Sequence, residues 1–122
     1  MNLAAYRKLI ASRRYLRLSA ALSGENLGNL AGLWPGLKPV EKLVLFKLME
    51  SKPAMELYRA LPFEEKYFLL LGHPAGSVAP AIEGLAPAVR RLFAEKPEGF
   101  YDRMLTFLVG DEVGIPLTYD RN

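Results

Sequence analysis

The sequence predicts an all-α domain of about seven short helices, stacked as helical hairpins in a right-handed, solenoid-like superhelix. Helix-forming residues dominate the chain, and no stretch alternates apolar and polar residues as a strand would. The chain contains nine prolines, several of them at positions that suit the first turn of a helix. Helices of about ten residues are marginal in isolation. We therefore expect them to share their apolar faces in one core.

The composition is typical of a single globular domain. The 122 residues are 51% apolar and 24% charged, which is enough to bury one core. The absence of cysteine excludes disulfides and thiolate metal sites. No apolar run approaches the roughly 18 residues of a membrane span, and the first residues lack the apolar stretch of a secretory signal. We expect a cytoplasmic protein without a membrane span.

Basic residues are concentrated in residues 1–22, for which we expect a basic leader helix. This segment carries five Lys and Arg and no acidic residue, whereas residues 23–122 carry eleven Lys and Arg and thirteen Asp and Glu. The net charge of +3 therefore arises entirely in the leader. Such an asymmetry is typical of a surface that binds phosphates, acidic lipid or an acidic partner, and equally of a solvated helix face.

The first helix after the leader is expected to begin near Ser23. Its hydroxyl suits a helix start, with Asn26 three residues further on. Gly32 and the following Pro35-Gly36 pair end this helix. Because Trp34 stands at that end, we expect it to be partly exposed.

Three more helices are expected before residue 72. Pro39 suits the first turn of a helix whose apolar residues lie on all sides, which predicts a buried central helix. Pro53 opens the next helix, and Pro62 ends it. Gly72 is a natural end for the third.

The C-terminal part is predicted from its prolines and glycines. Residues 73–86 indicate a Pro/Gly loop with a weak helical turn inside it. Residues 87–109 predict a pair of helices, which begin at Pro87 and Pro97. Residues 110–122 carry no strong pattern and are expected to form a tail. The whole chain, 1–122, is thus predicted to be a single helical domain.

Four leucine-rich segments within residues 22–72 each begin near a capping residue or a proline. They are "LSGENLGNLAGL", "LKPVEKLVLFKLM", "KPAMELYRALP" and "FEEKYFLLLG". This stretch resembles the helical-repeat cytoplasmic N-terminal domain of MgtE-type magnesium transporters. It is more distantly similar to the related repeats of the flagellar motor switch protein FliG. The resemblance implies stacked helical repeats and a docking role, not an enzymatic activity.

The sequence shows no catalytic or metal-binding pattern. His73 is the only histidine and has no nucleophile at a fixed spacing. Adjacent residues on a helix point about 100° apart, so Glu64 and Glu65 would not converge on one Mg²⁺ ion. Asp111 and Glu112 lie in the predicted tail, where nothing completes a coordination shell. We expect no catalytic, cofactor-binding or metal-binding residues.

The sequence therefore predicts a non-enzymatic protein–protein interaction or regulatory module. The predicted contact surface combines the basic leader with neighbouring aromatic residues, because arginine and aromatic residues dominate interface hot spots. Its residues are Arg13, Arg14, Tyr15, Arg17 and Trp34. We expect a protein partner with an acidic surface. A helical stack with an uncapped apolar end could also form a homo-oligomer.

Two alternatives stay open at this stage. Tyr6 and Tyr15 lie among the basic residues of the leader, as in a nucleic-acid-binding accessory protein whose affinity is salt-sensitive and independent of sequence. A core pocket near His73 would instead suit a small-ligand-binding protein or an enzyme. A copurifying small molecule would favour the latter.

Overall fold

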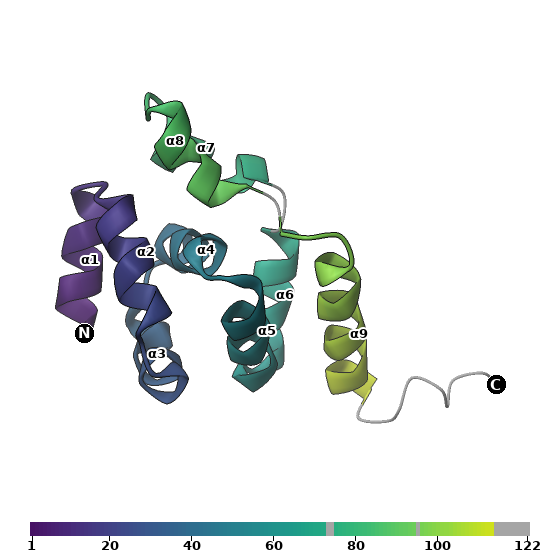
Figure 1. The fold of residues 1–122 in the computed structure, drawn as a ribbon. Helices are drawn as coiled ribbons and strands as arrows, with labels where there is room; N and C mark the ends of the chain where they lie inside the picture. The colour runs from purple at the N-terminus through teal and green to yellow at the C-terminus, as the bar shows by residue number, and fades with distance from the viewer. Residues whose placement is uncertain (73–74, 95, 114–122) are drawn as a thin grey trace.

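The computed structural model describes residues 1–72, 75–94 and 96–113 (Figure 1). These residues form nine α-helices and three short 3₁₀-helices, with no strand among them. The all-α prediction is confirmed, and the number of helices is close to the seven expected. The superhelical repeat arrangement stays a prediction. Within the described residues, no helix combines the length and the apolar character that crossing a membrane requires.

The helices are arranged around α4, which lies near the middle of the molecule (Figure 1). In chain order the elements are α1 (Leu3–Ala11), α2 (Tyr15–Ser23), α3 (Leu27–Leu33), η1 (Trp34–Gly36), α4 (Pro39–Leu48), α5 (Ser51–Ala60), α6 (Phe63–Leu71), η2 (Ala75–Val78), α7 (Ala79–Ile82), α8 (Pro87–Arg90), η3 (Arg91–Phe93) and α9 (Phe100–Val113). Helices α1 and α2 pack together and against α4, whereas α6 packs against α5 and α9. The segment from η2 to η3 covers α4 from a third side.

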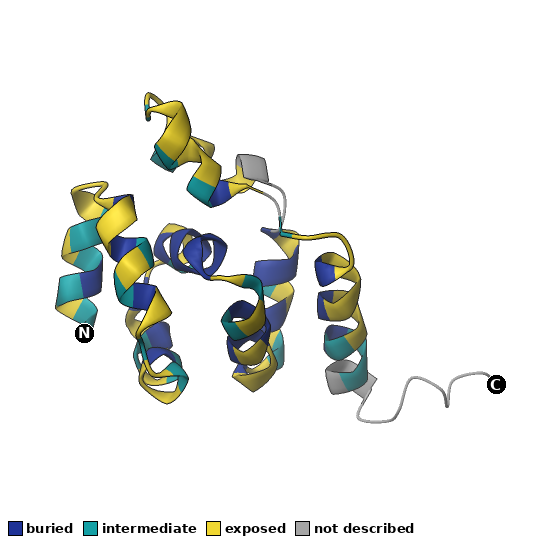
Figure 2. Ribbon diagram, viewed as in Figure 1, coloured by how far each residue is buried: buried dark blue, intermediate teal, exposed yellow. Residues whose placement is uncertain are grey.

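Helix α4 is the centre of the core, as the sequence predicts. Residues 43–49 are all buried, and Figure 2 shows α4 almost entirely in the colour of buried residues. Its first turn is capped by Glu41, whose Oε1 accepts a hydrogen bond from the backbone N–H of Lys38 at 2.7 Å. The other oxygen, Oε2, accepts from Nε of Arg7 at 3.1 Å. One carboxylate therefore both starts α4 and ties it to α1.

The predicted leader helix over residues 1–22 is in fact two helices that meet at Arg13. The φ angle of Arg13 is 57°, in the left-handed region that costs a residue with a side chain about 1–2 kcal/mol. The N–H of Arg13 bonds the carbonyl of Ile10, and the N–H of Arg14 bonds that of Leu9, both at 3.0 Å. These two bonds close α1 as a Schellman motif. The prediction of a single helix is therefore wrong. The sequence did not indicate the break, because no glycine or proline marks it.

Helix α3 is capped by Asn26 and not by Ser23. Oδ1 of Asn26 accepts a hydrogen bond from the N–H of Asn29 at 3.0 Å. Ser23 is instead the last residue of α2, and its hydroxyl donates to the carbonyl of Ala20. Because α2 extends to Ser23, the next residue able to cap a helix is Asn26.

The C-terminal elements differ from the predictions mainly at their ends. The predicted loop over residues 73–86 contains η2 and the short helix α7, and the helix after it is divided into α8 and η3. The last helix begins at Phe100 and not at Pro97. It extends into the predicted tail 110–122, of which residues 114–122 lie outside the described part of the chain.

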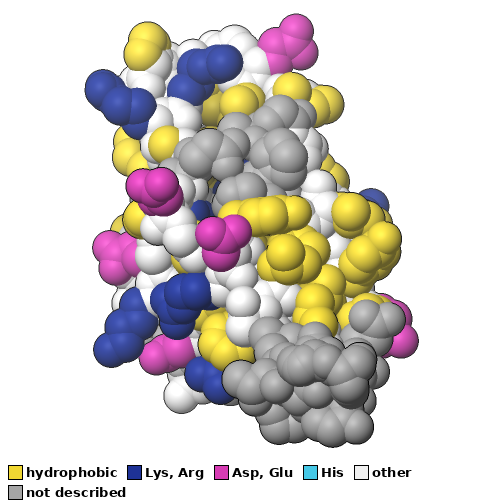
Figure 3. All heavy atoms as spheres, turned by 90° about the vertical axis from the view of Figure 1, so that its right-hand side faces the viewer, with side chains coloured by type: hydrophobic (Ala, Val, Ile, Leu, Met, Phe, Trp, Pro, Cys, Tyr) yellow, Lys and Arg dark blue, Asp and Glu magenta, His cyan; other side chains and the backbone are white. Residues whose placement is uncertain are grey.

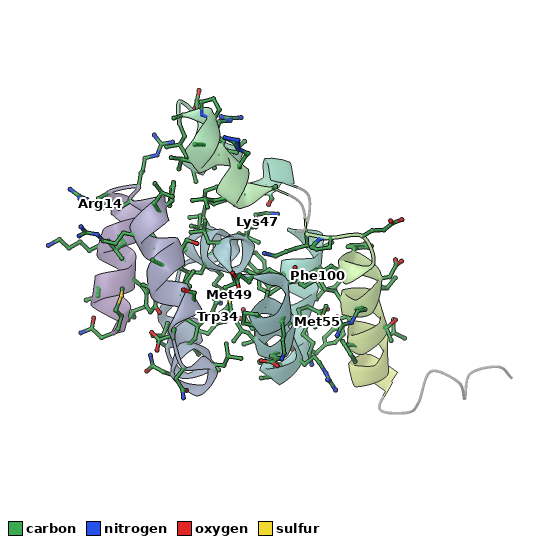
Figure 4. All side chains as sticks on the ribbon, viewed as in Figure 1. Arg14, Trp34, Lys47, Met49, Met55 and Phe100 are labelled. Carbon is green, nitrogen blue, oxygen red and sulfur yellow. The ribbon has the colours of Figure 1, made fainter. Side chains whose placement is uncertain are left out.

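Trp34 lies in the core, so the prediction that it is partly exposed is wrong. The side chain is 1% exposed, and its Nε1 donates a hydrogen bond to Oε1 of Glu65 at 3.2 Å. Nζ of Lys42 lies 2.9 Å from both oxygens of the same carboxylate. Figure 4 shows Trp34 in the interior, between the first helices and α5. The 3₁₀ turn η1 places the indole inside, where the sequence indicated only a helix end.

Candidate partner-binding surface

The five basic residues of the leader divide into two groups. Arg7 and Arg13 form hydrogen bonds within the protein. The side chains of Lys8, Arg14 and Arg17 make no hydrogen bond or ion pair within the described residues. Three cations of the leader are therefore available to a partner.

Arg13 and Tyr15 have structural roles that sequence reasoning missed. Nη2 of Arg13 donates to the carbonyl oxygens of Ala81 at 2.9 Å and Glu83 at 2.6 Å. The hydroxyl of Tyr15 donates to Ala81 as well, at 3.0 Å, and its ring meets that of Phe93 edge-on with centroids 5.0 Å apart. Tyr15 is 2% exposed. Both residues hold the α7–η3 segment against the α1–α2 hairpin, and Tyr15 is too deeply buried to contact a partner.

The three available cations lie around one hollow between α1 and α2, which we call the α1–α2 hollow. Its volume is about 540 Å³, and its lining residues are Met1, Ala5, Lys8, Leu9, Ser12, Arg14 and Arg17. None of these side chains is acidic. Figure 4 shows Arg14 at the outer end of the hairpin, directed away from the core. The hollow thus combines an aliphatic floor with a positively charged rim.

Glu25 anchors the start of the chain with four donors. It accepts hydrogen bonds from the Tyr6 hydroxyl at 2.5 Å, the Met1 ammonium at 3.1 Å, and Asn26 N–H and Asn29 Nδ2 at 3.0 Å each. The bond from Tyr6 is the main reason that the pKa of Glu25 falls to about 2, although burial opposes the shift. Burial, and then the carboxylate, raise the pKa of Tyr6. Tyr6 is fully buried, so it offers no aromatic surface.

Lys96 is a half-buried lysine outside this surface. Its Nζ donates to the carbonyl oxygens of Lys47, at 3.2 Å, and of Met49 at the end of α4. Burial, and then the neighbouring charge of Lys47, lower the pKa of Lys96 to about 8. The amine satisfies carbonyl groups that the end of a helix leaves without partners. We therefore assign it to holding the chain before α9 against α4.

The acidic pairs do not assemble a metal site in the described part of the chain. No group of three or more His, Cys, Asp and Glu side chains there could hold an ion. Glu65 pairs with Lys42 and accepts the indole N–H of the core, whereas Glu64 is exposed to solvent. Asp111 and Glu112 belong to α9 and not to a tail, with side chains outside the described set. His73 lies outside it as well.

A second exposed apolar area lies on α6 and α9. Tyr67 and Leu71 of α6 and Tyr101 and Leu105 of α9 are each between 41% and 63% exposed. These two helices pack side by side, and Figure 3 shows apolar side chains gathered on this side of the molecule. Charged residues are few in the centre of this area, in contrast to the basic rim of the α1–α2 hollow.

No family model matches the sequence, and neither a curated protein nor a solved structure is significantly similar to it. The resemblance of residues 22–72 to the MgtE-type domain therefore stays a prediction.

The position of Arg13 leads to a prediction about the α7–η3 segment. We expect Arg13→Ala to raise backbone hydrogen exchange at Leu85, Val89 and Arg90 about tenfold, because the variant loses the side-chain bonds that hold the segment. Exchange in the buried helix α4 should change much less. Arg14→Ala is the matched control, since Arg14 bonds nothing in the segment. Unchanged exchange in Arg13→Ala would show that these bonds do not fix the segment.

Proposed function

We propose that the protein is a non-enzymatic, cytoplasmic module that binds or regulates another protein through the α1–α2 hollow. One observation carries this proposal. Lys8, Arg14 and Arg17 lie around a single hollow and have no acidic neighbour there, while the remaining leader cations are used inside the fold. The docking role that the MgtE-type resemblance implies agrees with this proposal.

The partner surface is expected to be acidic. Cations without a partner near a concave surface raise the local concentration of anionic groups and speed association. Arg14 and Arg17 stay in the predicted surface and Lys8 is added, whereas Tyr15 and Trp34 are excluded by their burial. Arg13 is excluded because its guanidinium bonds the carbonyls of Ala81 and Glu83.

The burial of the two leader tyrosines favours a protein partner over a nucleic acid. Single-stranded nucleic acids are held by a basic groove together with exposed aromatic rings on which the bases stack. Tyr6 and Tyr15 are the aromatic residues of the leader, and both are buried. The apolar residues that line the hollow are all aliphatic, namely Met1, Ala5 and Leu9.

The proposal is tested by charge reversal in a quantitative pull-down from lysate with and without nuclease treatment. We expect the wild type to capture a protein partner, and Arg14→Glu/Arg17→Glu to capture at least about tenfold less. Acidic residues at the first turn of α2 favour the helix, so the variant should fold normally. Lys52→Glu/Arg103→Glu is the matched control, because it makes the same charge change at exposed positions on α5 and α9.

Three outcomes would count against the proposal. Equal capture by both double variants would place the interface elsewhere on the protein. Capture that disappears with nuclease would favour the nucleic-acid alternative. Failure of the wild type to capture any protein would remove the docking role.

A further inference from the structure

A second hollow shares Arg14 and Arg17 with the first and lies between the start of α2 and residues in and just before α8. We call it the α2–α8 hollow. Its volume is about 260 Å³, and its lining residues are Arg13, Arg14, Tyr15, Leu16, Arg17, Leu85 and Val89. Arg14 and Arg17 line both hollows, so they form a basic ridge between the two.

The wall of this hollow is held in place by the bonds of the α7–η3 segment. Arg13 and Tyr15 both bond the carbonyl of Ala81, which precedes α8 in the chain. Leu85 and Val89 are half-buried and present their remaining surface beside α2. Because the fold itself fixes this wall, a ligand would lose little free energy in ordering it.

Leu16 is the most prominent apolar residue of the hollow. It is 63% exposed, although Leu18 and Leu22 of the same helix are buried. A single exposed leucine is ordinary on a protein surface. Leu16, however, lines the same hollow as Arg14 and Arg17, together with the aliphatic residues Leu85 and Val89. Arginine is enriched among the residues that dominate binding energy at interfaces, and Leu16 adds apolar surface next to Arg14 and Arg17.

We propose that the α2–α8 hollow receives one apolar side chain of the partner, while Arg14 and Arg17 bind carboxylates on either side of it. The inference rests on the proposed function and specifies its partner. That partner is an acidic peptide segment with a single large aliphatic side chain among its acidic residues. The charge of the ridge selects the acidic residues, and the apolar lining selects the anchor.

The two parts of the interaction respond differently to salt. The attraction of the exposed arginines for carboxylates is screened within about 8 Å at physiological ionic strength. Burial of an apolar side chain does not depend on that screening. An acidic peptide with the anchor should therefore retain more of its affinity in salt than one without it.

The test compares two fluorescent peptides by anisotropy at low and at physiological salt. Both are Glu-rich and have the same length and net charge, and they differ only in a central leucine or alanine. We expect the leucine peptide to bind the wild type about tenfold more tightly, since burying the additional apolar surface is worth at least that factor. The preference should persist at the higher salt concentration.

A pair of matched variants then locates the anchor site. Leu16→Ser should remove the preference for the leucine peptide, and it leaves the charge of the ridge unchanged. Leu71→Ser is the control, because Leu71 is also 63% exposed but lies on α6. Both substitutions are at exposed positions and should leave the urea midpoint of unfolding nearly unchanged.

The outcomes separate this inference from the proposed function. Equal binding of the two peptides to the wild type, or a preference that survives in Leu16→Ser, overturns the anchor site and leaves the acidic docking surface intact. Binding of neither peptide, together with binding of a single-stranded DNA probe, overturns both. The inference is supported if the wild type and Leu71→Ser both bind the leucine peptide more tightly than the alanine peptide and Leu16→Ser does not.

Discussion

Replacing Trp34 by alanine is expected to lower the free energy of unfolding by about 3–5 kcal/mol. The indole is 1% exposed and belongs to the continuous core, so its removal leaves a cavity that the neighbouring side chains fill only in part. The substitution also removes the donor that bonds Glu65. A loss of this size is a large fraction of the stability of a small domain.

Urea denaturation followed by far-UV circular dichroism is the suitable measurement, because Trp34 is the only tryptophan and its fluorescence is lost in the variant. Trp34→Phe should lie between the wild type and Trp34→Ala, since it retains most of the apolar volume. Leu16→Ala, at an exposed position, should cost less than about 0.5 kcal/mol. A loss below 1 kcal/mol in Trp34→Ala would contradict the buried position and restore the exposure predicted from sequence.

The helices could be predicted from sequence because their signals are local. Pro39 in a first turn, apolar residues all around residues 40–49 and Gly72 after a leucine run each specify structure within a few positions. The break at Arg13 could not be predicted, because its left-handed conformation depends partly on bonds to the distant carbonyls of Ala81 and Glu83.

The candidate surface could be predicted only at the level of charge. The excess of basic residues in the leader is visible in the sequence and indicates an acidic partner. Which cations are available depends on contacts distant in sequence, such as that of Arg7 with Glu41. The exposure of aromatic residues depends on tertiary packing in the same way, which explains the errors at Tyr15 and Trp34. The run Arg14-Tyr15-Leu16-Arg17 was a local signal for Leu16 that the sequence-based prediction did not use.

Glu25→Ala is expected to lower the free energy of unfolding by about 2–4 kcal/mol at neutral pH. The carboxylate accepts a hydrogen bond from Tyr6, which is fully buried, so the variant leaves that hydroxyl without its acceptor. A hydrogen bond to a charged group contributes about 1.5–3 kcal/mol to stability. A buried hydroxyl that is left without an acceptor adds a further cost. Thermal and urea denaturation measure the loss.

Tyr6→Phe tests whether the two side chains act together. It removes the buried hydroxyl itself, so adding it to Glu25→Ala should cost less than the sum of the two single losses. Glu64→Ala, an exposed glutamate of α6, is the matched control and should be nearly neutral. Additive losses would show that the bond between Tyr6 and Glu25 contributes little.

The carboxylate of Glu25 also makes the free energy of unfolding depend on pH. The pKa of Glu25 is about 2 in the folded protein, below the ordinary value of 4.5, so the unfolded chain binds a proton more readily. The stabilisation is therefore complete above about pH 4.5 and is lost as the pH falls toward 2. The difference in unfolding free energy between the wild type and Glu25→Ala should shrink over this interval, because the variant has no carboxylate to protonate at this position. If the difference in unfolding free energy between the wild type and Glu25→Ala stayed constant from pH 6 to pH 2.5, the lowered pKa of Glu25 would be contradicted. The stability lost by Glu25→Ala at neutral pH would still measure the hydrogen bonds.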